Sequence, residues 1–212
     1  MNRNLKSKFI AFLMSAIAFT SFTACSDDED VPTPEKPGTL EVKEIMLSRK
    51  TNYGNDWIYF SLKEGKEIEV AEEDHMNNLS WDLAFNRYNI RTNSGLSGKG
   101  QGGASDTEVT DMKAVTTVPN GNFVVDTAAK ITGSFTGSGI TEVESTLNKA
   151  LGEAIKFAGP PPTYTPNNHV YIVKTADGKY AKIKVLGFHN EKGKSGFVSF
   201  QYVYQPDGTK NF

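Results

Sequence analysis

The sequence predicts an all-β protein, built mainly of antiparallel sheet, with one short helix near residues 141–156. Alternating apolar residues in the C-terminal third indicate strands, and Asp177-Gly178 predicts a tight turn between two of them. The chain also contains 19 glycines and 11% aromatic residues, a composition that favours turns and strands. With 212 residues, 38% of them hydrophobic, we expect one domain with a sizeable core.

The strands are predicted from enrichment in β-branched and aromatic residues and from alternation. The earlier ones are expected at residues 39–47, 56–62 and 130–137. "HVYIVKTADGKYAKIKVLGF" (169–188) contains two strands around the Asp-Gly turn, and "FVSFQYVYQ" (197–205) contains a third. The last of these strands carries its apolar side chains on one face: Val198, Phe200, Tyr202 and Tyr204. We therefore expect three consecutive antiparallel strands at the end of the chain.

The segment 80–90 begins as a strand but changes its pattern midway. Its apolar residues alternate and then change parity: Trp81, Leu83 and Phe85, followed by Tyr88 and Ile90. A β-bulge near Asn86 and Arg87 would reset the face of the strand, because one extra residue moves the following side chains to the other side.

One segment has helical periodicity. In "TEVESTLNKALGEAIKF" (141–157) apolar side chains recur at three- and four-residue intervals: Val143, Leu147, Ala150, Leu151, Ala154 and Ile155. Thr141 and Glu144 have the spacing of a capping box at the start of this segment. The proline-rich "GPPPTYTP" that follows would end the helix.

Residues 1–24 have the pattern of a lipoprotein signal peptide. Three basic residues precede an apolar run at residues 9–19, which is too short to span a bilayer. Thr23 and Ala24 then precede Cys25, the single cysteine of the chain, which has no partner for an internal disulfide. We expect cleavage before Cys25 and attachment of a diacylglycerol to its thiol. The alternative is an ordinary signal peptide followed by an incidental cysteine.

Residues 25–38 are expected to form a tether between the lipidated cysteine and a single folded domain, residues 39–212. The acidic run at residues 27–30 resembles the export signal of surface lipoproteins from the Bacteroides group, although a solvated linker has the same composition. The three prolines that follow favour an extended chain. The expected location is the outer membrane, with the domain at the cell surface and held to the membrane by the lipid anchor alone.

The glycine-rich loop after residue 92 shares some features with a phosphate-binding loop. A P-loop needs glycine six positions before its lysine and serine or threonine directly after it. Around Lys99 these positions hold Asn93 and Gly100, so no hydroxyl is available for Mg²⁺, and no helical pattern follows. The sequence therefore predicts a flexible glycine-rich loop in place of a nucleotide site.

No catalytic pattern is present elsewhere in the sequence. The histidines, His75, His169 and His189, are far apart, and neither His-x-x-x-His nor Cys-x-x-Cys occurs. No Gly-x-Ser-x-Gly lies in a strand-turn-helix context. The net charge is −2 with scattered basic residues, which gives no nucleic-acid footprint. We predict a protein that is not an enzyme and does not bind nucleic acid.

The segment "WDLAFNRYNIRTNSGLSGKGQGGA" (81–104) resembles a signature of the HmuY family, haem-binding surface lipoproteins of the Bacteroides group. The resemblance continues in "TDMKAVTTVP" (110–119), "GPPPTY" (159–164) and "VYIVKTADGKYAKIKV" (170–185), and with the N-terminal pattern it covers most of the chain. It implies an all-β fold likened to a hand that grips haem between finger-like hairpins. It also implies capture of haem from host haemoproteins and its delivery to a TonB-dependent outer-membrane receptor.

The chain departs from the family pattern where the resemblance places the two iron ligands, which are histidines or methionines in its best-known members. One position follows the "KITGSF" strand, and the other precedes the "PTY" turn, where Phe157 or its neighbour stands in this sequence. Between Ile131 and Tyr164 there is no His, Met or Cys. Tyr164 is the one residue of that window whose type ligates haem iron.

Three functions stay open on the sequence. The first is haem binding by apolar and aromatic contacts from Phe135, Phe157 and Tyr164, with an iron ligand from elsewhere, Met112 or His75. Met112 lies in a motif shared along the family, so a place in the core is its alternative. The second function is binding of another hydrophobic or planar ligand, and the third is an adhesion or receptor-partner module. Haem or a related porphyrin is the cargo that we expect first.

Overall fold

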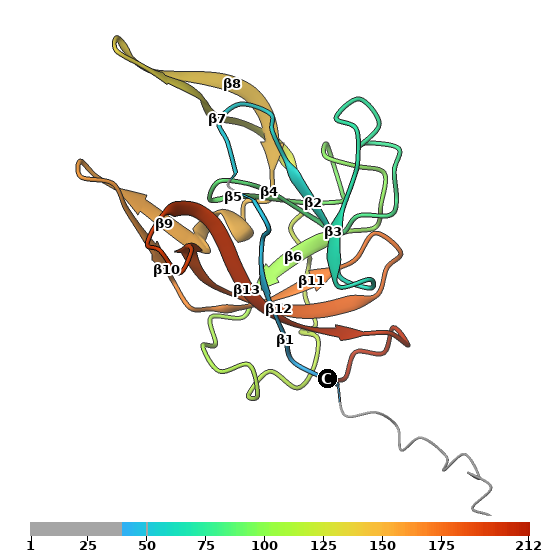
Figure 1. Ribbon diagram of the computed structural model, residues 1–212. Coiled ribbons are helices and arrows are strands. Elements are labelled where there is room, and N and C mark those ends of the chain that lie inside the picture. Colours follow the sequence, from blue (N-terminus) through green and yellow to red (C-terminus); the bar gives the residue numbers. More distant parts are fainter. Residues whose placement is uncertain (1–39, 50) are drawn as a thin grey trace, which may run out of the picture. The chain divides into compact units, whose positions relative to one another are not determined.

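Antiparallel β-sheet forms almost all the regular structure of the computed structural model, which describes residues 40–49 and 51–212 (Figure 1). The predicted all-β class is therefore confirmed. The described residues belong to one compact unit, Thr39–Phe212. Within them, no helix is long and apolar enough to cross a membrane. The predicted signal peptide, the lipidation site at Cys25 and the tether lie outside the described residues.

The strands form two larger sheets and two separate hairpins. The five-stranded sheet has the order β1-β13-β12-β11-β6, and its strands are β1 (Lys43–Met46), β6 (Gly103–Asp106), β11 (Val170–Lys174), β12 (Tyr180–His189) and β13 (Ser195–Gln205). The four-stranded sheet has the order β3-β2-β4-β5, and its strands are β2 (Ile58–Ser61), β3 (Lys66–Ile68), β4 (Leu83–Asn86) and β5 (Asn89–Thr92). The hairpins pair β7 (Thr127–Thr136) with β8 (Gly139–Leu147), and β9 (Ile155–Ala158) with β10 (Thr163–Pro166).

The main core joins the two larger sheets, because their strands turn alternate side chains toward each other. Phe200 of β13 meets Phe60 of β2 edge to face at 5.2 Å and stacks on Phe85 of β4 at 5.3 Å, measured between ring centroids. The predicted apolar face of β13 is confirmed, since its four residues all pack in or against this core. The predicted succession of three antiparallel strands is also confirmed, as β11, β12 and β13 are neighbours in one sheet.

Residues 83–92 form a tight hairpin and contain no β-bulge. β4 ends at Asn86, β5 begins at Asn89, and these two residues face each other across a two-residue turn. The turn sets Phe85 opposite Ile90, and both side chains remain in the main core. The bulge predicted near Asn86 and Arg87 is therefore wrong, because a hairpin turn also changes the parity of the apolar positions.

The helix predicted near residues 141–156 is also wrong. β8 occupies residues 141–147 of this segment and pairs with β7, with Val143 opposite Ile131, and β9 begins at Ile155. Two residues four apart, such as Val143 and Leu147, share one face of a strand as well as one face of a helix. Helical geometry is confined to a single 3-10 turn, η1 (Leu151–Glu153), between the two hairpins.

The residues of the predicted capping box serve the β7–β8 hairpin. The hydroxyl of Thr141 hydrogen-bonds that of Ser134 across the two strands at 2.7 Å. Glu144 forms an ion pair with Lys130, with 3.6 Å between their charged atoms. Because both side chains have partners on β7, neither is placed to cap a helix.

The glycine-rich loop is packed around Asn93, against the expectation of a flexible loop. The side-chain nitrogen of Asn93, Nδ2, donates to the backbone carbonyls of Asn78 and Trp81. Its side-chain oxygen, Oδ1, accepts the backbone N–H of Gly100 at 3.0 Å. A Cβ atom added to Gly100 or Gly102 would lie 2.6 Å from the carbonyl oxygen of Asn93. The glycines therefore allow a close approach of the chain to Asn93, which is a structural role.

Candidate binding site

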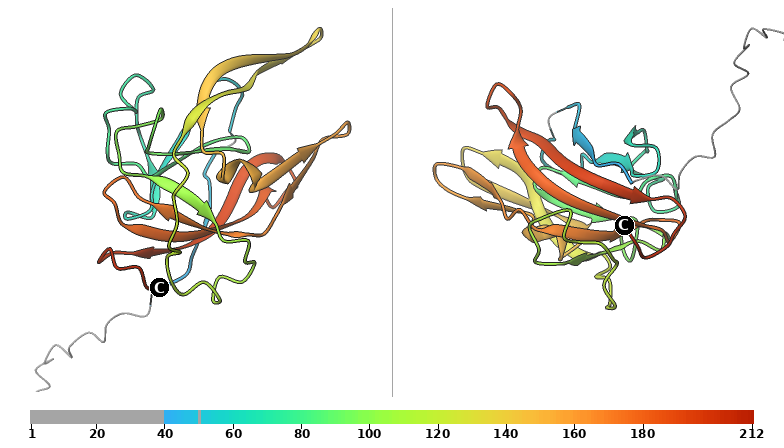
Figure 2. Two further views of the ribbon diagram at one scale, coloured as in Figure 1. Left: turned by 180° about the vertical axis from the view of Figure 1, so that it is seen from behind. Right: turned by 90° about the horizontal axis from the view of Figure 1, so that it is seen from below.

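The β7–β8 and β9–β10 hairpins project from the same side of the domain (Figures 1 and 2). Four aromatic side chains gather at the β9–β10 hairpin and the strands next to it, and we call them the aromatic surface: Tyr88, Phe157, Tyr164 and Phe188. Phe188 is 1% exposed and Phe157 is 42% exposed, so this group extends from the main core to solvent. Exposed aromatic rings of this kind are typical of binding sites.

Strand pairing sets the geometry of the aromatic surface. Phe157 of β9 and Tyr164 of β10 are direct cross-strand partners, and their ring centroids lie 5.3 Å apart. Tyr88, in the β4–β5 turn, lies parallel to Phe157, with an angle of 4° between the rings and 5.4 Å between the centroids. Tyr164 also contacts Phe188 of β12 at 4.3 Å. Three segments distant in sequence, the β4–β5 turn, the β9–β10 hairpin and β12, thus meet at one place.

Arg87 lies among these rings and connects them to Tyr53. Its Nη2 donates a hydrogen bond to the phenol oxygen of Tyr164 at 2.8 Å. Its guanidinium lies over the ring of Tyr53, 4.1 Å from the centroid, and within 6 Å of three rings of the aromatic surface. Cation–π contacts of this kind stabilise a positive charge that has left water.

Phe135 belongs to the other hairpin and reaches the same region through Tyr53. The rings of Phe135 and Tyr53 are 6.1 Å apart, and Phe135 is 62% exposed. Its cross-strand partner Ile140 is also exposed. Of the residues proposed from the sequence, the structure therefore brings Phe135, Phe157 and Tyr164 into one region between the hairpins.

His189 is a residue of this region that the sequence argument missed. It ends β12, is exposed, and its imidazole lies 5.9 Å from the ring of Tyr164, measured between centroids. Its imidazole has no hydrogen-bond partner among the described residues, whereas His169 is held by Asp106 at 3.0 Å. No sequence motif marks His189, because only the packing of β12 against the β9–β10 hairpin places it beside Tyr164.

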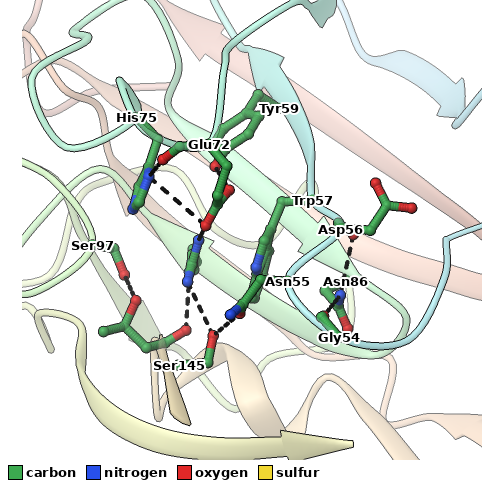
Figure 3. A network of polar contacts seen from close by, with 12 residues as sticks. Gly54, Asn55, Asp56, Trp57, Tyr59, Glu72, His75, Asn86, Ser97 and Ser145 are labelled. Carbon is green, nitrogen blue, oxygen red and sulfur yellow. Dashed lines mark hydrogen bonds and ion pairs between the residues drawn. The ribbon is translucent and has the colours of Figure 1, made fainter. Parts of the chain in front are cut away.

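His75 lies in a different part of the molecule, in a polar network that extends to Ser145 of β8 (Figure 3). Its Nδ1 contacts the backbone oxygen of Glu72, whose carboxylate accepts the hydroxyl of Tyr59 at 2.6 Å and pairs with Arg91 at 3.4 Å. Burial, followed by the nearby carboxylate of Glu72, raises the pKa of Tyr59 above its ordinary value. In turn, Arg91 hydrogen-bonds Ser145 of β8. The structure thus places His75 with groups that hold β8 against the body of the domain.

Met112 is also separate from the aromatic surface. It is 8% exposed and lies in a second core on the other face of the five-stranded sheet, together with Val115, Val118, Val170, Ile172 and Val203. The carbonyl oxygen of Met112 accepts a hydrogen bond from the buried Lys182 at 2.8 Å. These contacts correspond to the alternative in which Met112 is part of the core.

A pocket elsewhere in the domain does not coincide with the aromatic surface. It has a volume of about 470 Å³, lies beside β2 and β3, and is lined by side chains of both charges, among them Lys63, Glu64 and Asp177, and by none of the candidate residues. Within residues 40–49 and 51–212, no three His, Cys, Asp or Glu side chains are grouped to hold a metal ion. The aromatic surface is therefore the place where the candidate residues converge.

The fold and this surface define an antiparallel β protein that presents aromatic side chains between two projecting hairpins. The family model for the HmuY protein matches residues 53–202, and the chain belongs to the HmuY family. The resemblance expected from the sequence is thereby confirmed. No curated protein matches the chain.

Solved structures give the same fold. A protein of Bacteroides vulgatus, described as HmuY-like and haem-binding, is 27% identical with a TM-score of 0.63, and the match covers 77% of this chain and 91% of that one. A protein of Bacteroides fragilis, described as a lipoprotein, is 25% identical with a TM-score of 0.63, covering 78% and 91%. An apo HmuY analogue of Tannerella forsythia is 24% identical with a TM-score of 0.65, and the match covers 80% of this chain and 98% of that one. At this identity the match shows that the two proteins share a fold.

Proposed function

We propose that this chain is a cell-surface lipoprotein that binds haem or a related porphyrin on the aromatic surface and delivers it to a TonB-dependent outer-membrane receptor, without acting as an enzyme. Membership of a haem-binding family supports the class of ligand. The observation that carries the proposal is the half-exposed ring of Phe157, stacked on Tyr88 and continuous with the core through Tyr164 and Phe188.

A porphyrin suits this surface because it is wide, flat and apolar on both faces. The exposed rings of Phe157 and Phe135 belong to two different hairpins and offer flat apolar contacts. Tyr53 and Arg87 connect them, because Phe135 contacts Tyr53, Arg87 lies over Tyr53 and near Tyr88, and Tyr88 stacks on Phe157. Burial of such area stabilises a complex without any bond to iron. An imidazole is a common axial ligand of haem iron, and His189 is the histidine that lies beside the aromatic surface.

Titration of residues 31–212 with haemin tests this function. We expect a shift of the Soret band that saturates at one equivalent. The shift should be lost in His189→Ala and retained in His75→Ala and Met112→Ala, which lie in other clusters. Loss of the shift in Tyr164→Phe alone would identify the phenol as the ligand. Absence of any shift under both oxidised and reduced conditions would contradict iron ligation.

The anchor is a separate part of the proposal. It is supported by the pattern of residues before Cys25 and by the relative from Bacteroides fragilis that is described as a lipoprotein. In a Bacteroides host, Cys25→Ser should abolish incorporation of labelled fatty acid and move the protein out of the outer-membrane fraction. Protease added to intact cells should degrade the wild-type domain; protection of the domain would contradict surface exposure.

A further inference from the structure

We infer that the ligand of the aromatic surface carries a carboxylate group and that Arg87 binds this carboxylate. The inference rests on the proposed function for the location of the ligand, but it does not depend on iron. It predicts that porphyrin carboxylates without any metal bind at the same place as haem.

The basis is a buried positive charge that has no acidic partner. Arg87 is 7% exposed, and within residues 40–49 and 51–212 its buried Nε has no hydrogen-bond partner. The side-chain hydrogen bond that it forms with these residues joins Nη2 to the hydroxyl of Tyr164. Among the described residues, no carboxylate forms an ion pair with Arg87. Buried arginines are otherwise almost always paired, because removal of a charge from water is unfavourable.

Arg91, four residues along the chain, shows how this protein satisfies a buried arginine. It is 3% exposed, and its guanidinium lies 3.8 Å from the centroid of the Trp57 ring. It pairs with the carboxylate of Glu72 and also donates to Thr146 and Ser145. Arg87 has the equivalent aromatic contact, with Tyr53, but lacks the carboxylate. The missing partner is the group that a ligand would supply.

The surroundings of Arg87 define the rest of the ligand. The guanidinium is planar, and its N–H groups match the two oxygens of a carboxylate. The rings of Tyr88, Tyr164 and Phe188 lie within 6 Å of the guanidinium carbon, and Tyr88 and Tyr164 are partly exposed, so a flat apolar group can pack on them. A ligand that satisfies both requirements is a planar aromatic system with an acidic side chain, and the propionate-bearing porphyrins have this chemistry.

Three porphyrins separate the contributions of iron, ring and carboxylate: haemin, the iron-free dicarboxylic acid and the dimethyl ester of that acid. Each is titrated into wild type, Arg87→Met, Arg87→Lys and Lys156→Met by quenching of tryptophan fluorescence. Lys156→Met is the matched control, because it removes an exposed positive charge of β9 next to Phe157. Thermal denaturation of each variant verifies that it is folded.

We expect wild type to bind the diacid on the order of tenfold to a hundredfold more tightly than the ester, since a hydrogen bond to a charged group contributes that much. Arg87→Met should lower the affinity for the diacid to that for the ester, and Arg87→Lys should restore part of the difference. Lys156→Met should retain the full preference. The ester comparison needs no substitution, so it tests the inference even if Arg87→Met fails to fold.

The outcomes separate this inference from the proposed function. Equal affinity of wild type for diacid and ester would overturn the role of Arg87, whether or not haemin binds. Binding of the iron-free diacid that depends on Arg87, with no Soret shift for haemin, would support the inference and contradict iron ligation. Failure of all three compounds to bind would overturn both.

Discussion

Aromatic rings gather in two regions of this protein, and the regions differ in what surrounds the rings. In the main core, Phe60 and Phe85 of the four-stranded sheet and Phe200 of the five-stranded sheet are completely buried, and the first two rings each contact the third. On the aromatic surface, the ring of Phe157 has Tyr88 beside it but remains 42% exposed. The same residue type thus stabilises the fold in one region and is available to a ligand in the other. Substitutions should separate these two roles.

The largest effect is expected in the main core. Phe200→Ala removes a buried ring from between the two sheets, and it should lower the free energy of unfolding by about 3–5 kcal/mol. Denaturation in urea measures this change. Phe197→Ala, on the same strand but only half-buried, is the matched control and should have a smaller effect. Equal losses in the two variants would show that the core does not depend on the packing of Phe200.

An intermediate effect is expected in the glycine-rich loop. Gly100→Ala would bring a methyl group within 2.6 Å of the Asn93 carbonyl oxygen and 2.9 Å of Cα of Ala176, and we expect a loss of about 1–3 kcal/mol. Gly137→Ala lies at the turn of the β7–β8 hairpin, where the added methyl group would have no atom within 4 Å. It should change the free energy of unfolding by less than about 0.5 kcal/mol. If thermal denaturation gives the two variants the same melting temperature, the loop is not held around Asn93.

The smallest effect on stability, and the clearest effect on binding, is expected on the aromatic surface. Phe157→Ala should lower the free energy of unfolding by about 1 kcal/mol, because it loses partial aromatic contacts, and should weaken haemin binding by about tenfold. Leu96→Ala removes an exposed apolar side chain elsewhere and should leave haemin binding unchanged. A loss of stability as large as that of Phe200→Ala, with unchanged affinity, would assign Phe157 to the core.

Strands could be predicted from the sequence where the residue pattern fits a strand and does not fit a helix. The alternation along β13 and the Asp-Gly turn before β12 both correspond to the structure. A two-residue period is specific to strands, and Gly178 adopts the positive φ that such a turn requires. Residues 141–156 were ambiguous, because a spacing of four residues fits a strand as well as a helix. Pairing with β7 resolves that ambiguity, and pairing is not visible in the segment itself.

The candidate site was predictable in part for the same reason. Phe135, Phe157 and Tyr164 were identified because they lie in the window that the family resemblance marks, and they do converge. His189 and Arg87 were not identified as site residues, because each stands in an ordinary strand or turn sequence. Their importance comes from neighbours that are 25 and 77 positions away in the chain, as the contacts with Tyr164 show.

The sequence by itself determined the all-β class, the strands of the C-terminal meander and the family of this protein, because these depend on local periodicity, turn residues and motif order. The tertiary structure decided that residues 139–147 are a strand, that the glycine-rich loop is packed around Asn93, and that Arg87 is buried beside Tyr164 without a carboxylate. Each of these depends on which distant segments meet, and the free energy of such contacts belongs to the folded chain as a whole.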